Sequence, residues 1–268
     1  MSAVSQTEPP GVDAQLGEAE SGLRRSFAIA RSTLRWILAG GYFFTVCPVL
    51  ILLGAFVDPR KNDSPQRWMS RTILRLAGAK VQVRCSPGFD PTRTSFFVCN
   101  HVNLFDPFIL YSVVPHFIRG LELESHFRIP VYGALMKRFG NVPVPSTTKP
   151  SDLKRMWRLT RSALDKGVSL VVFPEGSRTV TGHVGQFQDG VFRMALQFGT
   201  PIVPVSVAGS FEFNRKTSWM LRPATIVVYL HDTIETAGLK KDDVPALRDR
   251  VRNIVAAPIE QRLSGKEL

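Results

Sequence analysis

The longest apolar stretch runs from residue 36 to residue 56 and reads WILAGGYFFTVCPVLILLGAF, 21 residues without a charge. As one helix it would be about 31 Å long, close to the roughly 30 Å hydrocarbon core of a bilayer. We predict that it enters a membrane, as one spanning helix or as a re-entrant hairpin bent at Gly40, Gly41 or Pro48. The alternative is a buried helix of a soluble protein. A signal peptide is disfavoured because the stretch is long, starts late and lacks a convincing cleavage site.

Basic residues flank this stretch on both sides. Four precede it and five follow it: Arg24, Arg25, Arg31 and Arg35, then Arg60, Lys61, Arg67, Arg71 and Arg75. The positive-inside rule therefore gives no orientation. Cations on both flanks suit a segment whose ends lie on a negatively charged membrane face. We expect the cytoplasmic face of the inner or plasma membrane.

Beyond residue 75, short apolar runs alternate with amphipathic segments. The runs predict strands over residues 80–84, 95–99, 141–144, 168–173, 202–207 and 225–230. Helices are predicted after Asp106 and over residues 130–139, 151–166, 190–198 and 243–262. The last has one apolar face, formed by Val244, Leu247, Val251, Ile254 and Val255.

This alternation predicts an α/β fold with a mixed, largely parallel sheet flanked by helices. Three regions follow from the pattern along the chain. Residues 1–22 are polar and aperiodic and are expected to form a flexible acidic tail. Residues 23–75 are expected to form a membrane-associating helical segment, and residues 76–268 the α/β domain.

Charge points to the kind of partner. The formal net charge is +12, and because residues 1–23 carry −4, the rest of the chain carries +16. So basic a chain favours polyanions: nucleic acid, anionic lipid head groups or phosphorylated small molecules. It contains no zinc-finger, RNA-binding or helix-turn-helix pattern, so we expect a membrane partner and no nucleic acid. The three cysteines and five histidines show no metal-ligand spacing, and no metal site is expected.

Candidate chemistry begins at Asn100-His-Val-Asn-Leu-Phe-Asp106, directly after a predicted strand. On one helix His101 and Asp106 would lie about 140° apart and could not touch. Because Asp106 precedes Pro107, we predict that Asp106 caps a helix and that the loop folds the His101 ring back onto its carboxylate. The carboxylate would then orient a general base. In isolation, this spacing also fits a simple helix cap beside a loop histidine.

A second block, Phe173-Pro-Glu-Gly-Ser-Arg-Thr179, follows an apolar run at a strand end, where α/β folds place ligands. Gly176 permits a turn with positive φ. Glu175 can accept a hydrogen bond from an acceptor hydroxyl or hold Arg178, whose planar guanidinium suits phosphate or carboxylate. By itself the block also fits a tight turn with a surface ion pair.

Over about residues 95–207 the chain resembles the glycerophospholipid acyltransferase family and is similar to bacterial 1-acylglycerol-3-phosphate acyltransferases. Its Asn-His-x4-Asp motif and the motif at 173–179 are both complete. Ile129-Pro130-x-x-Gly133 and the element at 201–205 match two further motifs. The resemblance implies catalysis by His101 and Asp106. It implies substrate binding by Asn100, Glu175, Gly176, Ser177 and Arg178.

The chain lacks several cations that the family motifs usually supply. Residues 124–126 replace a Lys-x-Glu-Leu-like element, residues 145–147 replace a later arginine, and Gln188 stands where a lysine is usual. Four other cations could bind an acceptor phosphate instead or could be solvated surface charges: Arg119, Arg128, Lys137 and Arg138.

The resemblance implies that His101 removes a proton from a lysolipid hydroxyl, whose oxygen attacks the thioester of acyl-CoA or acyl-carrier protein. The expected acceptor is 1-acylglycerol-3-phosphate; the alternatives are a lyso-ornithine lipid, a lyso-glycolipid or another lysophospholipid. No cofactor is expected beyond the thioester co-substrate. No Gly-x-Ser-x-Gly element occurs, so no serine acyl-enzyme is expected.

Backbone N–H groups near the helix that begins at Pro107, or in a neighbouring loop, are expected to bind the oxyanion. Two other functions remain open from the sequence. One is a thioester hydrolase that uses the same His–Asp pair to activate water. The other is a non-catalytic basic scaffold at the membrane.

Overall fold

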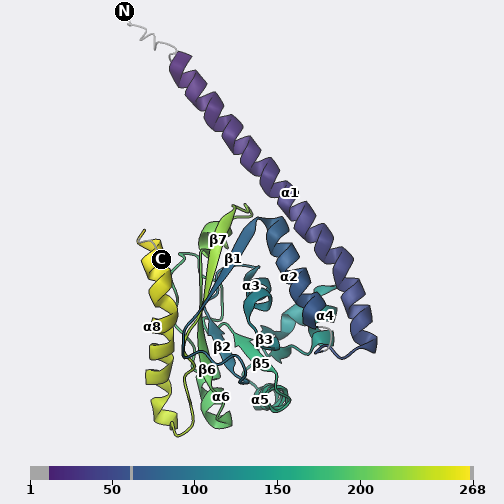
Figure 1. Cartoon of the computed structure of the whole chain (residues 1–268), viewed down its shortest axis with the longest axis vertical. Helices are drawn as coiled ribbons and strands as arrows, with labels where there is room; N and C mark the ends of the chain where they lie inside the picture. Colours follow the sequence, from purple (N-terminus) through teal and green to yellow (C-terminus); the bar gives the residue numbers. More distant parts are fainter. Residues whose placement is uncertain (1–11, 61–62, 266–268) are drawn as a thin grey trace, which may run out of the picture.

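The computed structural model describes residues 12–60 and 63–265. It begins with helix α1 (Val12–Phe56), 45 residues long, which projects beyond the α/β domain (Figure 1). Residues 12–22, predicted as part of a flexible tail, form the first turns of α1. This segment is rich in Ala, Glu, Gln and Leu, which favour helix. Residues 1–11 of the predicted tail lie outside the described residues.

The apolar stretch forms one continuous helix and not a hairpin, because α1 runs through Pro48 without interruption. One face of α1 packs on α2 (Asp63–Ala77), which the sequence did not predict as a separate helix. Cys47 and Leu50 are buried there, and Cys47 Sγ lies 3.8 Å from Met69 Sδ. This packing offsets the hydrogen bond that Pro48 removes from the helix.

Much of the apolar surface of α1 is exposed. Among the described helices, only α1 is long and apolar enough to cross a membrane, over Gly22–Phe56, and 22% of its most apolar window is buried. Its exposed large side chains include Phe27, Ile37, Phe44, Leu52 and Phe56. A core helix of a soluble protein would bury such a surface. We conclude that α1 is not a buried core helix.

The centre of the domain is a seven-stranded sheet in the order β1-β7-β6-β2-β5-β3-β4. The strands are β1 (Ala79–Cys85), β2 (Phe96–Cys99), β3 (Ile118–Leu123), β4 (Val142–Val144), β5 (Ser169–Val172), β6 (Ile202–Ala208) and β7 (Ala224–Leu230). All neighbours pair in parallel except β6 and β7, which are antiparallel. The predicted mixed, largely parallel sheet is confirmed. The sequence analysis missed β3, because Arg119 and Gly120 interrupt its apolar pattern.

Helices cover both faces of the sheet (Figure 1). One layer comprises α1, α2, α3 (Asp106–Val113) and α4 (Tyr132–Phe139); the other comprises α5 (Pro150–Asp165), α6 (Gly190–Phe198) and α8 (Val244–Leu263). Strand β2 serves both cores, since Phe97 and Cys99 enter the first and Phe96 and Val98 the second. The short elements are η1 (Glu124–Arg128), α7 (Ser210–Phe213) and η2 (Lys241–Asp243).

Helix α1 is tied to the loops at the carboxyl edge of the sheet. The Trp36 ring lies 5.5 Å from the Phe105 ring, and Trp36 Nε1 donates to the carbonyl of Trp219 at 2.7 Å. The backbone N–H of Leu221 donates to Ser32 Oγ at 2.9 Å. The apolar helix is therefore fixed beside the loop that carries the first sequence motif.

The Gly133→Ala variant should lower the free energy of unfolding by about 1–3 kcal/mol. A Cβ at Gly133 would lie 2.3 Å from the carbonyl oxygen of Phe127, so η1 or α4 would have to shift. Gly190→Ala is the control, because a Cβ there meets nothing within 4 Å; we expect no loss and a gain of at most about 1 kcal/mol. Urea unfolding measures the free energy of unfolding of both variants. Equal values for the two would contradict the prediction.

Candidate active site

The two residues of the first motif meet in the structure. His101 Nδ1 lies 2.8 Å from Asp106 Oδ2, with the His101 side chain 22% exposed and the Asp106 side chain fully buried. The loop between β2 and α3 folds the ring back onto the carboxylate, which confirms the predicted geometry. Nε2 of His101 makes no hydrogen bond to any described residue, so it remains available to a substrate.

The Asp106 carboxylate accepts hydrogen bonds from two more groups of the same loop. The N–H of Val102 donates to Oδ2 at 2.6 Å and that of Asn103 at 2.9 Å. Because the carboxylate is surrounded by donors, the His101 ring donates from Nδ1, which leaves Nε2 as the basic nitrogen. The His–Asp pair therefore has the tautomer that a general base needs.

The prediction that Asp106 caps α3 is wrong. The helix starts at Asp106 itself, Phe105 occupies the N-cap position, and no side chain caps the helix. The carboxylate instead turns back toward the loop, where His101 and the two N–H groups hold it. Pro107 does lie in the first helical turn, as predicted.

The sequence analysis missed Ser210, which supplies a further donor. Ser210 lies at the start of α7, directly after β6, and its Oγ donates to Asp106 Oδ1 at 2.9 Å. Asn103 Nδ2 donates to Ser210 Oγ at 2.8 Å and to the Ser210 carbonyl at 2.9 Å. No local signal reveals Ser210, because it lies 104 positions beyond Asp106 and reaches it only through the pairing of β6 with β2.

Glu175 of the second motif binds backbone and not Arg178. Its Oε1 accepts the N–H of His101 at 2.7 Å, and its Oε2 accepts the N–H of Gly185 at 2.9 Å. Burial raises the pKa of Glu175, and the two N–H donors oppose that rise. Glu175 thus joins the loop after β5 to the backbone of His101. Of the two roles that the sequence allowed for Glu175, the ion pair with Arg178 does not form.

The rest of the second motif lies beside His101. The N–H of Thr179 donates to the His101 carbonyl at 2.9 Å, so Arg178 is next to the catalytic loop. The Arg178 guanidinium forms no hydrogen bond or ion pair with the described residues. Gly176 has a φ of +70°, as its turn requires, and Ser177 is exposed. Their predicted contacts with substrate stay predictions.

Asn100 lies at the end of β2 and is buried. Its Oδ1 accepts the N–H of Val207 at 2.8 Å, and its Nδ2 donates to the Val207 carbonyl at 3.2 Å. The amide thus fastens β2 to β6 just before His101. The predicted substrate contact of Asn100 stays a prediction, and the structure adds this structural role.

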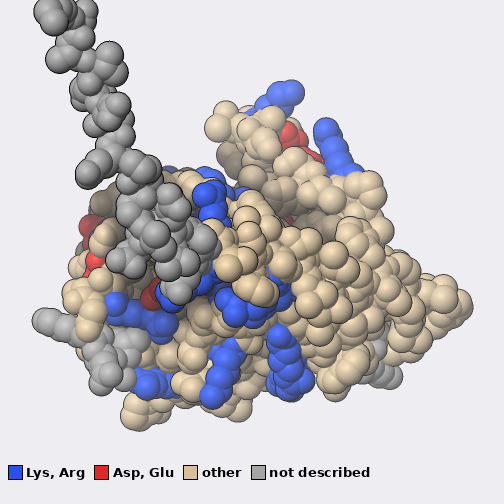
Figure 2. Space-filling view, turned by 90° about the horizontal axis from the view of Figure 1, so that it is seen from above, with Lys and Arg blue, Asp and Glu red and all other residues tan. Residues whose placement is uncertain are grey.

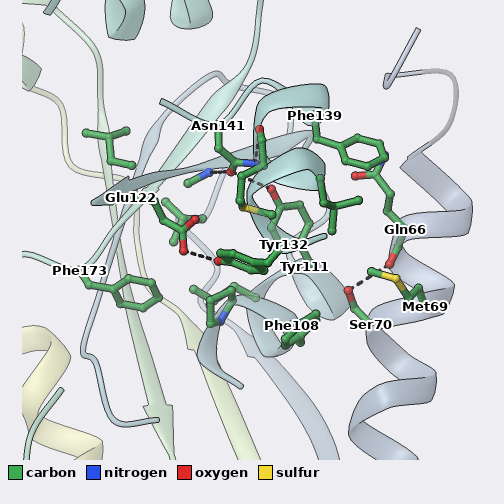
Figure 3. Close-up of a pocket in the computed structure, with 17 residues that line it drawn as sticks. Gln66, Met69, Ser70, Phe108, Tyr111, Glu122, Tyr132, Phe139, Asn141 and Phe173 are labelled. Carbon is green, nitrogen blue, oxygen red and sulfur yellow. Dashed lines mark hydrogen bonds between the residues drawn. The ribbon is translucent and has the colours of Figure 1, made fainter. Parts of the chain in front are cut away.

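An apolar slot lies next to Phe173, whose ring contacts His101. The Phe173 ring stacks on the His101 ring with centroids 4.2 Å apart, and Phe173 also lines the slot. Figure 3 shows the slot extending from Phe173 toward Phe139 and Met69, between α2, α3, α4 and strands β3 and β5. Phe173 therefore contacts both the His101 ring and the slot.

One carboxyl group lines this slot. Glu122 Oε1 accepts the hydroxyl of Tyr132, while the buried Oε2 has no partner (Figure 3). Burial raises the pKa of Glu122, because the apolar surroundings disfavour the charged form. The sequence analysis did not single out Glu122, since β3 was missed.

Two of the four alternative cations of the sequence analysis lie at the opposite edge of the sheet from His101. Arg119 is buried in β3, and both Arg119 and Arg138 line a second cleft. That cleft lies at the amino-terminal ends of β3, β4 and β5, whereas His101 follows the carboxyl end of β2. Arg128 and Lys137 are exposed.

The amides at the start of α3 are mostly engaged, which bears on the predicted oxyanion site. Val102 and Asn103 donate to Asp106, and Phe105 donates to Asn103 Oδ1 at 2.8 Å. In the neighbouring loop the N–H groups of Ser177 and Arg178 make no hydrogen bond to any described residue. That loop is therefore the better source of free donors.

A protein-family model described as Acyltransferase matches residues 80–208. The chain is 27% identical over 174 residues to the 1-acyl-sn-glycerol-3-phosphate acyltransferase of Cocos nucifera, covering 65% of this chain and 56% of that protein. It therefore spans little more than half of the coconut protein. It is 26% identical over 211 residues to the enzyme of that name from Haemophilus influenzae, covering 76% of this chain and 86% of the relative.

The fold also matches a solved structure. The crystal structure of the 1-acyl-sn-glycerophosphate acyltransferase PlsC from Thermotoga maritima superposes with a TM-score of 0.75 at 20% identity, covering 91% of this chain and 99% of that one. The sheet and its flanking helices thus have the α/β fold of this solved acyltransferase. Over residues 80–208 the chain is similar to the acyltransferase family.

The Glu122→Gln variant should be more stable than the wild type at neutral pH. The raised pKa of Glu122 means that ionising it costs stability in the folded state, and Gln can still accept the Tyr132 hydroxyl. The cost is absent below the unfolded pKa of about 4.3 and grows as the pH rises through the higher folded value.

Denaturant unfolding of the wild type and of Glu122→Gln from pH 4 to pH 8 measures this trend. The advantage of the variant should be small at the acidic end and should increase with pH. A difference that stayed constant or shrank with rising pH would contradict the assigned shift.

Proposed function

We propose that this protein moves a fatty acyl group from acyl-CoA or acyl-carrier protein to the free hydroxyl of 1-acylglycerol-3-phosphate, giving phosphatidic acid. The observation that carries the proposal is the His101 ring, oriented by Asp106, with a free Nε2 and a stacked Phe173 that opens into an apolar slot. The names of the curated relatives support the choice of acceptor.

The reaction uses the chain's own groups. Nε2 of His101 takes the hydroxyl proton while the acceptor oxygen attacks the thioester carbonyl, and Asp106 stabilises the imidazolium. The tetrahedral intermediate then collapses, the carbon–sulfur bond breaks, and the departing thiolate takes the proton back from Nε2. No metal or cofactor is required besides the thioester co-substrate.

The acyl chain would occupy the apolar slot next to His101. Its lining is almost entirely apolar, with Phe108, Leu135, Met136 and Phe139 among the contacts. Each methylene group buried there would contribute about 0.8 kcal/mol of favourable transfer free energy. A chain that enters past Phe173 would leave its thioester carbonyl beside Nε2.

The loop after β5 would hold the charged parts of the reaction. The free N–H groups of Ser177 and Arg178 would meet the oxyanion, and the unpaired Arg178 guanidinium would bind the acceptor phosphate. Ser177 and Arg178 lie beside His101, because the N–H of the following Thr179 donates to the His101 carbonyl. The acceptor hydroxyl would then reach Nε2 with its phosphate anchored.

A membrane is the proposed location, at the cytoplasmic face. Helix α1 presents exposed apolar side chains along its length and contacts the catalytic loop through Trp36 and Phe105. Figure 2 shows that basic side chains outnumber acidic ones on the face seen from the amino-terminal end of α1. An apolar helix beside a basic face suits an anionic bilayer surface, where lysolipids lie.

A second acceptor class is favoured by one observation. Where a lysine is usual in the family, the neutral Gln188 lies against the motif loop, with its Nε2 only 2.6 Å from the place a Cβ of Gly176 would occupy. The site therefore offers less positive charge than the family motif implies. A lysolipid with a less charged head group, such as a lyso-ornithine lipid or a lyso-glycolipid, fits this change.

The His101→Ala variant should lose acyl transfer by roughly a hundredfold to ten-thousandfold, because it removes the base. His183→Ala is the control, since His183 is exposed and pairs with Glu260. Purified protein in detergent is incubated with labelled acyl-CoA and a lysolipid panel. Retained activity in His101→Ala would contradict the assigned role.

The same panel separates the functions that the sequence left open. Lipid-dependent product supports transfer and ranks the acceptors. Free fatty acid released without lipid would identify a hydrolase, and no turnover of either kind would favour a scaffold. Circular dichroism of each variant checks that it folds.

The Arg178→Ala variant should raise the KM for 1-acylglycerol-3-phosphate by about tenfold or more, because it removes a charge-assisted bond to phosphate. The KM for acyl-CoA should change less than about twofold, since in this proposal the thioester substrate makes no contact with the Arg178 guanidinium. Arg158→Ala removes an exposed cation of α5 as the control. Equal effects on both substrates would contradict the assignment to the acceptor.

A further inference from the structure

Arg119 is a buried cation without a counter-ion among the described residues. It is 1% exposed; its Nε bonds the carbonyl of Phe139, and its Nη1 donates to the carbonyl of Ile118 at 2.7 Å. Nη2 is buried and has no partner. The guanidinium lies 3.9 Å from the centroid of the Phe117 ring, 5.5 Å from that of Phe139 and 5.9 Å from that of Tyr111. These rings and the two carbonyls offset part of the cost of burying the charge, and Nη2 still lacks an acceptor.

Arg119 lines a cleft that gathers more positive charge. Arg60, Arg138 and Lys166 also line it, with one carboxylate, that of Asp58. Asp58 Oδ1 is already engaged, since it accepts the N–H of Arg60 at 2.8 Å. The cleft has a volume of about 390 Å³, within the usual range for small-ligand sites. It is therefore large enough and positive enough for a phosphorylated head group.

The cleft is separate from the active site. Phe117, Val142 and Val168 mark its position at the amino-terminal ends of β3, β4 and β5. His101 and Phe173 follow the carboxyl ends of β2 and β5, at the opposite edge of the same parallel strands. An anion in the cleft would not touch the His–Asp pair.

The cleft also lies where the apolar surface of α1 ends. Leu52, Phe56 and Val57 are exposed at the carboxyl-terminal end of α1, and Arg60 follows Val57 three positions later. The Arg138 side chain packs on α1, since a Cβ at Gly54 would lie 3.2 Å from its Cγ. Exposed apolar side chains therefore lead directly into a group of cations. A phospholipid has the same order, with apolar tails joined to an anionic phosphate.

We propose that this cleft binds the phosphate of an anionic membrane phospholipid, with Arg119 and Arg138 as its main ligands and the lipid tails along the end of α1. Arg60 and Lys166 add charge at the rim. The site is a second lipid-binding site, distinct from the acyl slot and from the acceptor loop. It would hold the carboxyl-terminal end of α1 at the head-group level of the bilayer.

The test is calorimetric titration of the full-length protein, in an uncharged detergent, with dihexanoylphosphatidylglycerol and with inorganic phosphate. No thioester is present, so the result does not depend on acyl transfer. All proteins also carry Arg178→Ala, so binding at the proposed acceptor loop is weakened throughout. The cleft variant is Arg138→Gln with Lys166→Gln. The matched control is Lys154→Gln with Arg158→Gln, two exposed cations of α5 outside the cleft.

The cleft variant should bind the lipid at least about tenfold more weakly, because it loses charge-assisted bonds to phosphate, and the control should change less than about twofold. Unchanged affinity in the cleft variant, or an equal loss in the control, would overturn the site. Inorganic phosphate that bound as tightly as the lipid would overturn the lipid assignment.

A single variant tests the buried ligand. Arg119→Lys keeps one positive charge but removes the planar fork, and we expect a loss of lipid affinity as large as in the cleft variant. Unfolding curves check that it folds, and if it does not, the cleft variant decides. Wild-type affinity in folded Arg119→Lys would show that Arg119 does not bind the anion.

Discussion

The buried carboxylate of Asp106 organises the active site. An unpaired carboxylate would be too costly to bury, so the fold must supply donors to it. The donors come from His101, from two N–H groups of the same loop and from Ser210 beyond β6. They hold the loop, the tautomer of the ring and the start of α7 in one arrangement. The orientation of the His101 ring is thus a consequence of how the buried Asp106 charge is satisfied.

Much of the fold could be predicted from the periodicity of the sequence. Buried parallel strands are continuous apolar runs, so β2, β5 and β6 were evident, and the amphipathic pattern of α8 was equally clear. Strand β3 was missed because it carries the buried Arg119, whose guanidinium bonds the carbonyl of Phe139, a residue 20 positions away that no local pattern reveals. The continuity of α1 through Pro48 depends on packing against α2, which no local rule describes.

Only some of the contacts within the candidate site could be predicted from the sequence. The pairing of His101 with Asp106 follows from five positions of local sequence, and the structure confirms that geometry. Ser210 and the backbone contacts of Glu175 could not be predicted, because they join segments brought together by the sheet. Asp106 was predicted as a helix cap because Pro107 follows it. In the structure the stronger demand is the burial of its charge.

The most direct test of this account is the tautomer of His101, measured by ¹⁵N NMR of histidine-labelled protein with the signal assigned by its loss in His101→Gln. We predict that the neutral form of the ring carries its proton on Nδ1, because that nitrogen donates to Asp106. In Asp106→Asn the proton should shift toward Nε2 in a measurable fraction of molecules. A wild-type ring protonated on Nε2, with Nδ1 bare, would contradict the account.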